Sequence, residues 1–284
     1  MTRAFGLDQV IARLTDAKID DAAHWAELIE DEVAGLPVDA RSQRAAELAE
    51  ICAGGAPQLA YALGRQKFMG LDLIAERGVI VPRPVTERVG RVAVRLMERM
   101  RAESPERPLR VVDMCGGSGN LACGLAHADP RCRVWSCDLM QPASDLATRN
   151  AARLGISDRL AVRTGDLFGA LDADKLEGTV DLVVCAPPFI STGRLAKDRA
   201  HLLEHEPREA FDAGPYGLTI HQRTAEDAAR FLRPGGYLVF EVGEGQEKQV
   251  AIVFKRARMY DEIQAVEDGL GPIVVVQGRR KFET

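Results

Sequence analysis

The first part of the chain shows the spacing of amphipathic helices. Apolar side chains recur at steps of three and four residues, as at Val10, Leu14, Trp25 and Leu28. Glycine and proline interrupt this pattern around residues 35–37 and 54–57 and separate one helix from the next. We therefore expect an N-terminal helical bundle over residues 1–67.

From residue 109 onward, short β-rich runs alternate with helical stretches. The first five runs cover residues 109–115, 133–138, 160–165, 180–186 and 237–242. This alternation predicts a parallel sheet wrapped by helices. Two further runs, at 260–266 and 273–276, are too close together for a helical crossover and should pair as an antiparallel hairpin. The predicted fold class is α/β, with a Rossmann-like sheet of five parallel strands plus an antiparallel pair.

The segment between these two regions has a different pattern. Residues 71–74 alternate and residues 79–81 run apolar on either side of a turn-like Glu76-Arg77-Gly78, which predicts a hairpin. We therefore expect three parts along the chain. They are the helical bundle at 1–67, a hairpin and connector at 68–86, and an α/β domain at 87–284.

The composition is that of a globular protein. Hydrophobic residues make up 46% of the 284 residues and charged residues 28%, which excludes a disordered or fibrous chain. The net charge of −5 provides no general attraction to nucleic acid or to anionic lipid, so neither partner is expected.

Cysteine spacing and hydropathy add two expectations. The six cysteines lack the paired spacing of a zinc site, so we expect reduced thiols and no metal. No apolar run approaches the roughly 18 residues that a membrane helix needs, and no signal-like apolar core follows Met1. A cytoplasmic location is the resulting expectation.

A glycine-rich turn joins the first strand of the predicted sheet to the helix that follows. Asp113 lies in the strand, and Cys115, Gly117 and Gly119 lie in the turn. Glycine lets the chain turn sharply and lets a ligand approach bare backbone beside a helix N-terminus. The dinucleotide pattern G-x-G-x-x-G would need glycine at Ala122, so a nicotinamide site fits less well.

Two further acids end the next two strands. Asp138 follows the turn by about 20 residues, where a carboxylate can accept both hydroxyls of a ribose. Asp166 ends the third strand, where it can accept an adenine amino proton while Leu167 packs on the ring. Because open α/β sheets bind ligands at the carboxyl ends of their strands, these acids and Asp113 predict one ligand site.

The fourth strand ends in Ala186-Pro187-Pro188-Phe189. Two prolines fix the backbone and remove donors, which aims the preceding carbonyl into the crevice, and an aromatic ring can pack against a flat or cationic group. His205 follows within residues 195–206, a segment that is either a lid over the site or a solvated connector. The candidate catalytic residues are Ala186, Pro187, Phe189 and His205.

The order of these motifs resembles the class I S-adenosylmethionine (SAM) methyltransferases, and more narrowly the HemK/PrmC-like protein-glutamine N-methyltransferases that modify translation release factors. The resemblance covers nearly the whole chain, including Glu206-Pro207-Arg208. It implies SAM as the cofactor of a catalytic domain at 87–284, with the methionine part at the glycine turn, the ribose at Asp138 and the adenine at Asp166. The cofactor-binding residues that it implies are Asp113, Cys115, Gly117, Gly119, Asp138, Leu139, Asp166 and Leu167.

One motif departs from this family. The family carries Asn-Pro-Pro-Tyr after strand four, where the Asn side chain and the Pro carbonyl hold the acceptor amide, whereas this chain has Ala186 and Phe189 at the two ends of the motif. Alanine has no polar side-chain atom, and phenylalanine has no hydroxyl. Because an unpaired buried amide costs ~1–3 kcal/mol per group, we expect a non-glutamine, small-molecule acceptor and no release-factor partner.

Two other functions stay open from the sequence. Without an external acceptor, the α-amino group of SAM could displace methylthioadenosine and close a four-membered ring, as in the SAM cyclases that form azetidine-2-carboxylate. Alternatively, the chain could bind SAM as a catalytically silent scaffold. The products formed from SAM alone and from SAM with an acceptor distinguish the three functions.

Overall fold

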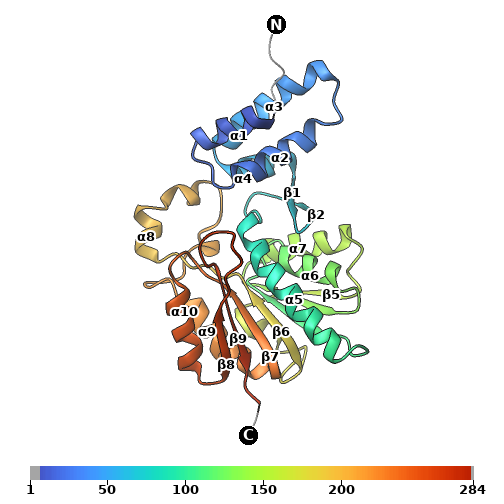
Figure 1. The fold of residues 1–284 in the computed structure, drawn as a ribbon, viewed down its shortest axis with the longest axis vertical. Helices are drawn as coiled ribbons and strands as arrows, with labels where there is room; N and C mark the ends of the chain where they lie inside the picture. The colour runs from blue at the N-terminus through green and yellow to red at the C-terminus, as the bar shows by residue number, and fades with distance from the viewer. Residues whose placement is uncertain (1–6, 283–284) are drawn as a thin grey trace. The chain divides into compact units, whose positions relative to one another are not determined.

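The computed structural model describes residues 7–282, apart from the side chain of residue 39. The chain divides into two units, Met1–Arg77 and Gly78–Thr284. Figure 1 shows the helical first unit mostly in blue and the α/β second unit in the colours that follow. Each unit buries a set of apolar side chains of its own.

Four helices make up most of the described part of the first unit, and they confirm the N-terminal helical domain of the predicted fold class. They are α1 (Leu7–Asp16), α2 (Ala22–Val33), α3 (Val38–Ala53) and α4 (Ala56–Leu63). Their apolar faces bury Trp25, Ile29 and Leu48. Gly64 ends α4 with a φ of 68°, a left-handed conformation that glycine adopts without steric cost.

The hairpin that follows begins earlier than the sequence predicts. β1 (Arg65–Phe68) pairs with the antiparallel β2 (Leu71–Ile74). The predicted pairing of residues 79–81 with the second of these strands is therefore wrong. β1 lacks the alternating apolar pattern of a strand, but its polar residues are paired: the Arg65 guanidinium donates to the Glu32 carboxylate at 2.7 Å.

The second unit alternates strands and helices. A 3-10 helix, η1 (Pro84–Thr86), leads into the helices α5 (Glu87–Glu103), α6 (Asn120–Ala128), α7 (Gln141–Arg153), α8 (Thr192–Lys197), α9 (Thr219–Phe231) and α10 (Glu247–Ala257). Further 3-10 turns are η2 (Leu167–Leu171), η3 (Ala200–Glu204) and η4 (Arg208–Ala210). Within residues 7–282, none of the helices is both long and apolar enough to cross a bilayer.

Seven strands of this unit form one sheet. They are β3 (Arg110–Met114), β4 (Arg133–Asp138), β5 (Leu160–Thr164), β6 (Val180–Cys185), β7 (Leu232–Glu241), β8 (Tyr260–Ala265) and β9 (Val275–Arg280). The spatial order is β5-β4-β3-β6-β7-β9-β8. The first five strands run parallel, and β9 is antiparallel to both β7 and β8, which confirms the predicted sheet.

Two strands extend beyond their apolar runs. β7 begins at Leu232 because this residue already pairs with Val180 of β6. β9 continues to Arg280 because this residue pairs with Tyr260 of β8. Strand pairing therefore continues through polar residues that carry no hydrophobic signal.

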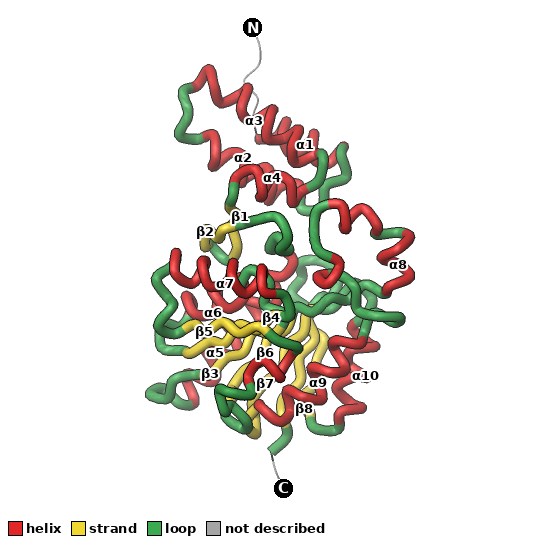
Figure 2. Tube along the Cα trace, turned by 180° about the vertical axis from the view of Figure 1, so that it is seen from behind, coloured by secondary structure: helices red, strands yellow, loops and turns green. Residues whose placement is uncertain are grey.

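Helices cover both faces of the sheet, as Figures 1 and 2 show. α6 contacts both α5 and α7, and α9 contacts α10. Successive residues of a strand point to opposite faces, and Val112 and Met114 of β3 share a buried cluster with Phe240 of β7 and Ala228 of α9. The helices leave open the two ends of the sheet, where the parallel strands begin and where they end. Ligands can bind at these ends.

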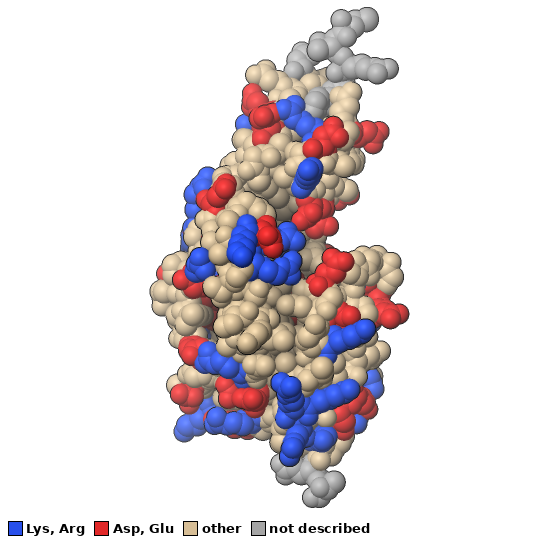
Figure 3. Space-filling model, turned by 90° about the vertical axis from the view of Figure 1, so that its left-hand side faces the viewer, with Lys and Arg blue, Asp and Glu red and all other residues tan. Residues whose placement is uncertain are grey.

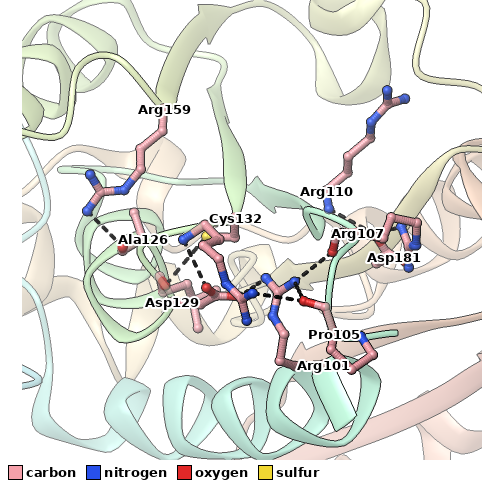
Figure 4. Close-up of polar contacts among 11 residues, drawn as sticks. Arg101, Pro105, Arg107, Arg110, Ala126, Asp129, Cys132, Arg159 and Asp181 are labelled. Atoms are coloured by element: carbon pink, nitrogen blue, oxygen red, sulfur yellow. Dashed lines mark hydrogen bonds and ion pairs between the residues drawn. The ribbon is translucent and has the colours of Figure 1, made fainter. Parts of the chain in front are cut away.

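Most charged side chains lie at the surface, and Figure 3 shows acidic and basic ones interspersed over one face. Asp181, near the start of β6, is instead fully buried. Arg107 donates to both carboxylate oxygens at 2.8 and 2.5 Å, and Arg233 Nε donates at 2.5 Å. The Arg110 N–H adds a bond of 2.9 Å (Figure 4). Burial raises the pKa of Asp181, but the arginine hydrogen bonds outweigh it and leave the pKa below its ordinary value.

We predict that Asp181→Asn lowers the free energy of unfolding by about 3 kcal/mol, because Arg107 and Arg233 lose their buried partner. Denaturant unfolding at neutral pH measures this change. The depressed folded-state pKa means that Asp181 stabilises the fold above its unfolded-state pKa of about 3.9, and that this stabilisation disappears as pH falls through the folded-state pKa. The variant should lack this acid-sensitive contribution.

Glu103→Gln is the matched control. It removes a carboxylate that lies 3.9 Å from Arg99 in an exposed pair, so the unfolding free energy should change by less than about 1 kcal/mol. If Asp181→Asn changed stability no more than this control does, the buried carboxylate would not be the stabilising element assigned here.

Candidate active site

A cavity of about 290 Å³ lies at the carboxyl edge of the sheet. Part of its wall comes from residues at or just after the ends of β3, β4, β5 and β6, which is where open α/β sheets bind ligands. Most of the remaining wall comes from two segments far apart in sequence, residues 78–80 and 207–212, and Ala143 of α7 and Ile220 of α9 also contribute. The predicted residues that line it are Cys115, Gly117, Asp138, Leu139, Asp166, Leu167 and Ala186.

The glycine turn after β3 brings bare backbone to this cavity. Gly117 has a φ of 54°, and Cys115 has a φ of 61°, a conformation that non-glycine residues seldom adopt. Gly119 also has a positive φ, of 76°, but it is not among the lining residues. A Cβ at Gly119 would lie 2.9 Å from the Cβ of Ala147. Gly119 therefore allows α6 to pack closely on α7.

Asp113 lies beneath the turn and is only 1% exposed. Its Oδ2 accepts a 3.0 Å hydrogen bond from the Ala122 N–H in the first turn of α6. Burial raises the pKa of Asp113 to about 7, although this hydrogen bond opposes the shift. Asp113 holds the start of α6 against β3 and is not among the residues that line the cavity.

Asp138 ends β4 and faces the cavity. Its Oδ2 accepts from the Gly117 N–H at 2.8 Å, and its Oδ1 accepts from the Met140 N–H at 2.9 Å. Burial raises the pKa of Asp138, and these backbone bonds oppose the rise. The carboxylate thus ties the ends of β3 and β4 together, and its remaining lone pairs are available to a ligand. The adjacent Leu139 is exposed at the rim.

Asp166, after β5, lies at the open side of the cavity. Its side chain is 60% exposed, and its Oδ2 accepts from Arg223 Nη2 at 2.7 Å. Leu167 has a φ of 48° and a buried side chain that contributes to the lining. The structure therefore brings Asp138 and Asp166 to one cavity.

The strand-four motif contributes only part of its length to the cavity. Ala186 and Pro188 line it, whereas Pro187 is buried and Phe189 is half-buried outside the lining. The Phe189 carbonyl accepts a 3.0 Å hydrogen bond from Gln246 Nε2. This bond fixes the motif to the segment that follows β7.

The wall formed by residues 207–212 lies just beyond the predicted lid segment. Glu206 positions it, because Oε1 accepts a 2.8 Å bond from the Val81 N–H and Oε2 pairs with Arg83. His205 is half-buried and is not among the lining residues. Val81 and Glu206 are 125 positions apart, so no local pattern predicts this wall. The resemblance at Glu206-Pro207-Arg208 was its one sequence signal.

The lining carries more negative than positive charge. Its charged residues are Asp138, Asp166, Arg208, Glu209 and Asp212. Arg208 Nη1 donates to Asp212 at 2.9 Å. A hydrogen bond from the Thr192 hydroxyl, aided by Arg208, holds the pKa of Asp212 below its ordinary value. The excess of carboxylates favours a cationic ligand.

The fold and the cavity together define a class I SAM-dependent methyltransferase. The family described as "Methyltransferase small domain" matches residues 87–267. The chain belongs to this family, and its relatives include release factor glutamine methyltransferases.

Two relatives of this chain are named for different methyltransferase activities. It is 36% identical over 219 residues to a release factor glutamine methyltransferase of Moorella thermoacetica, covering 77% of this chain and 73% of that protein. It is 38% identical over 193 residues to a 4-amino-L-phenylalanine/4-methylamino-L-phenylalanine methyltransferase of Streptomyces pristinaespiralis, covering 68% of this chain and 63% of that protein.

The solved structures agree on the fold. A methyltransferase from Pyrococcus furiosus matches with a TM-score of 0.54 and 16% identity, covering 81% of this chain and all of that one (100%).

S-adenosylmethionine is the cofactor of this class, and the cavity fits it. The turn offers bare backbone at Gly117, and Asp138 offers a carboxylate with unused lone pairs. Leu139, Met140 and Leu167 add apolar surface. The negative lining suits a sulfonium cation.

We predict that Asp138→Ala weakens SAM binding by at least tenfold, because from the sequence we expect this carboxylate to accept charge-assisted hydrogen bonds from the sugar hydroxyls. Isothermal titration calorimetry measures the loss. Asp166→Ala is the matched control, and its effect should be several-fold smaller because its carboxylate is exposed and paired with Arg223. A far-UV spectrum and a melting curve check that the Asp138 variant folds. Wild-type affinity in a folded Asp138→Ala protein would place the ribose elsewhere.

Proposed function

We propose that this protein transfers a methyl group from SAM to a nitrogen of a small molecule, and that the glutamine of a release factor is not its acceptor. Ala186 is the observation that carries the proposal, because the strand-four position that lines the cavity has no polar side chain. A glutamine amide placed here would lack a partner, at a cost of ~1–3 kcal/mol per unpaired group. An acceptor without that amide avoids the cost.

The rest of the motif supports the same proposal. Phe189 lacks the hydroxyl of the family's tyrosine, and its carbonyl already accepts the Gln246 amide N–H. Pro187 is buried and stiffens the loop. We assign Ala186 and Pro188 to the acceptor side of the cavity, with Pro187 and Phe189 shaping the loop from behind. His205 belongs to the segment that leads into the opposite wall.

We infer the cofactor contacts from the residues that line the cavity. Cys115 and Gly117 face the methionine part, Asp138 and Leu139 the ribose, and Asp166 and Leu167 the adenine. Asp113 and Gly119 act from beneath as positioning residues, because one holds α6 and the other allows its close packing. When bound, SAM supplies an electrophilic methyl group on its sulfonium.

The lining also bears on the kind of nitrogen that accepts the methyl group. Among the described residues that form it there is no lysine or histidine, which favours an acceptor whose lone pair is free without a strong base. An aromatic amine is uncharged at neutral pH, whereas an alkyl amine is protonated. The relative from Streptomyces pristinaespiralis is named for an aromatic amine. The exposed Glu209 carboxylate at the cavity can take the proton that leaves the nitrogen.

We predict that the purified protein, given SAM and 4-amino-L-phenylalanine, forms S-adenosylhomocysteine and an N-methylated product that mass spectrometry detects. A release-factor peptide with its target glutamine is the control acceptor and should yield little product. Methylthioadenosine with azetidine-2-carboxylate from SAM alone would instead establish a cyclase. SAM binding without turnover of any aromatic amine or peptide would identify a scaffold. Either result would reject methyl transfer.

Ala186→Asn tests the argument from the motif. We predict that it raises kcat/KM for the glutamine peptide by at least tenfold, because it restores hydrogen bonds worth ~1–3 kcal/mol to the amide. Release of S-adenosylhomocysteine measures this rate. Ala186→Val, which adds volume without a polar group, is the matched control and should gain nothing. Unchanged glutamine activity in an Ala186→Asn protein that still binds SAM would show that other residues exclude the peptide.

A further inference from the structure

A second cavity lies at the opposite edge of the sheet, where the parallel strands begin. Its volume is about 490 Å³, and its lining residues are Arg107, Pro108, Arg110, Arg133, Thr179 and Arg233. β4 runs from Arg133 at this cavity to Asp138 at the methyltransferase cavity, so the length of the strand separates the two. We propose that this second cavity binds a compact ligand that carries a diphosphate group.

Two of the four guanidiniums share a single carboxylate. Arg107 and Arg233 both donate to the buried Asp181. Each guanidinium has five N–H donors, so the bonds to one carboxylate leave most of these donors unused. Asp181 therefore fixes the positions of both arginines while neutralising only one of their two charges.

The other two guanidiniums have no hydrogen-bond or ion-pair partner among residues 7–282. They belong to Arg110 and Arg133, the first residues of β3 and β4. Figure 4 shows the Arg110 side chain pointing away from Asp181, with no dashed line at its guanidinium. Four positive side chains thus line a cavity whose described lining residues include no carboxylate, and the buried Asp181 behind it balances only one of these charges.

The sheet register adds a second reason to expect an anion. Arg110 and Arg133 are directly paired on neighbouring strands, and like charges in directly opposed positions destabilise a sheet. An anion between the two guanidiniums would turn this repulsion into two attractions. Guanidinium groups bind phosphate through two parallel N–H···O bonds, so one phosphoryl group for each of these arginines gives a diphosphate.

The loop that presents Arg107 is held in place by hydrogen bonds within the chain. Arg101 Nη1 donates to the carbonyls of Pro105 and Arg107 at 3.3 and 2.6 Å, and its Nη2 pairs with Asp129 (Figure 4). Arg131 Nη1 donates to the same Pro105 carbonyl at 2.8 Å. A site ordered in advance loses less conformational freedom on binding.

The size of the cavity and the charge of the chain favour a small ligand over a nucleic acid. The net charge of −5 opposes the broad phosphate-backbone contact that nucleic-acid binding needs. Four guanidiniums instead line one small cavity. RNA also carries phosphoryl groups, so the experiment includes both a small phosphate ligand and an RNA.

Titration calorimetry of the full chain with inorganic pyrophosphate tests the proposal. We expect one-to-one binding that weakens about tenfold in Arg110→Gln and again in Arg133→Gln, because each variant removes charge-assisted hydrogen bonds. Orthophosphate should bind more weakly than pyrophosphate, because it spans only one of these guanidiniums. Arg256→Gln is the matched control: it removes one exposed positive charge from α10, outside the cavity, and should retain wild-type affinity.

Two further measurements keep the outcomes distinct. SAM binding should be unchanged in every variant, and Arg110→Lys, which keeps the charge, should retain part of the affinity if Arg110→Gln fails to fold. A single-stranded RNA decamer should bind more weakly than pyrophosphate. Tighter RNA binding would overturn the choice of a compact ligand, as would pyrophosphate binding that Arg256→Gln weakens equally. Absence of any pyrophosphate binding to the wild-type protein would overturn the site itself.

Discussion

The catalytic edge of this protein depends on how closely the glycine turn after β3 packs against its neighbours. A Cβ at Gly116 would overlap the Ser136 hydroxyl of β4, and one at Gly119 would press on Ala147 of α7. Because the backbone comes this close, the Gly117 N–H reaches the Asp138 carboxylate, and that bond keeps the carboxylate at the cavity. The site is therefore built first by backbone packing, and the side-chain chemistry follows from where that packing places Asp138.

Much of this edge could be predicted from the sequence because the strands that form it are short segments with a regular apolar pattern. β4 is visible as a run that ends in Asp138, and parallel strands end at one edge, so its carboxylate could be placed without a structure. A linear motif does not say which way each residue faces, however. Asp113 near the end of β3 and Gly119 in the turn that follows are close to Gly117 in sequence, yet they act on α6 from beneath the cavity.

The sequence did not predict features that depend on contacts between distant segments or on the pairing of polar side chains. The bond from the Val81 N–H to Glu206 sets one wall of the cavity, and the bond from Gln246 to Phe189 holds the strand-four motif. Such contacts leave no periodic trace along the chain. The strand β1 was missed for a related reason, because the pairing of Arg65 with Glu32 stabilises residues that read as a polar connector.

The strand-four motif shows how, under the proposed function, a scaffold can keep its shape while its acceptor changes. The loop is held by prolines and by the Gln246 amide, and neither depends on the residue at position 186. A polar residue at position 186 is therefore not needed to hold the loop, and under the proposed function Ala186 affects acceptor recognition. The two ends of the parallel strands also differ in the charge of their side chains. Carboxylates prevail where the strands end and guanidiniums where they begin, so a sulfonium and a phosphoryl group are each attracted to one edge and opposed at the other.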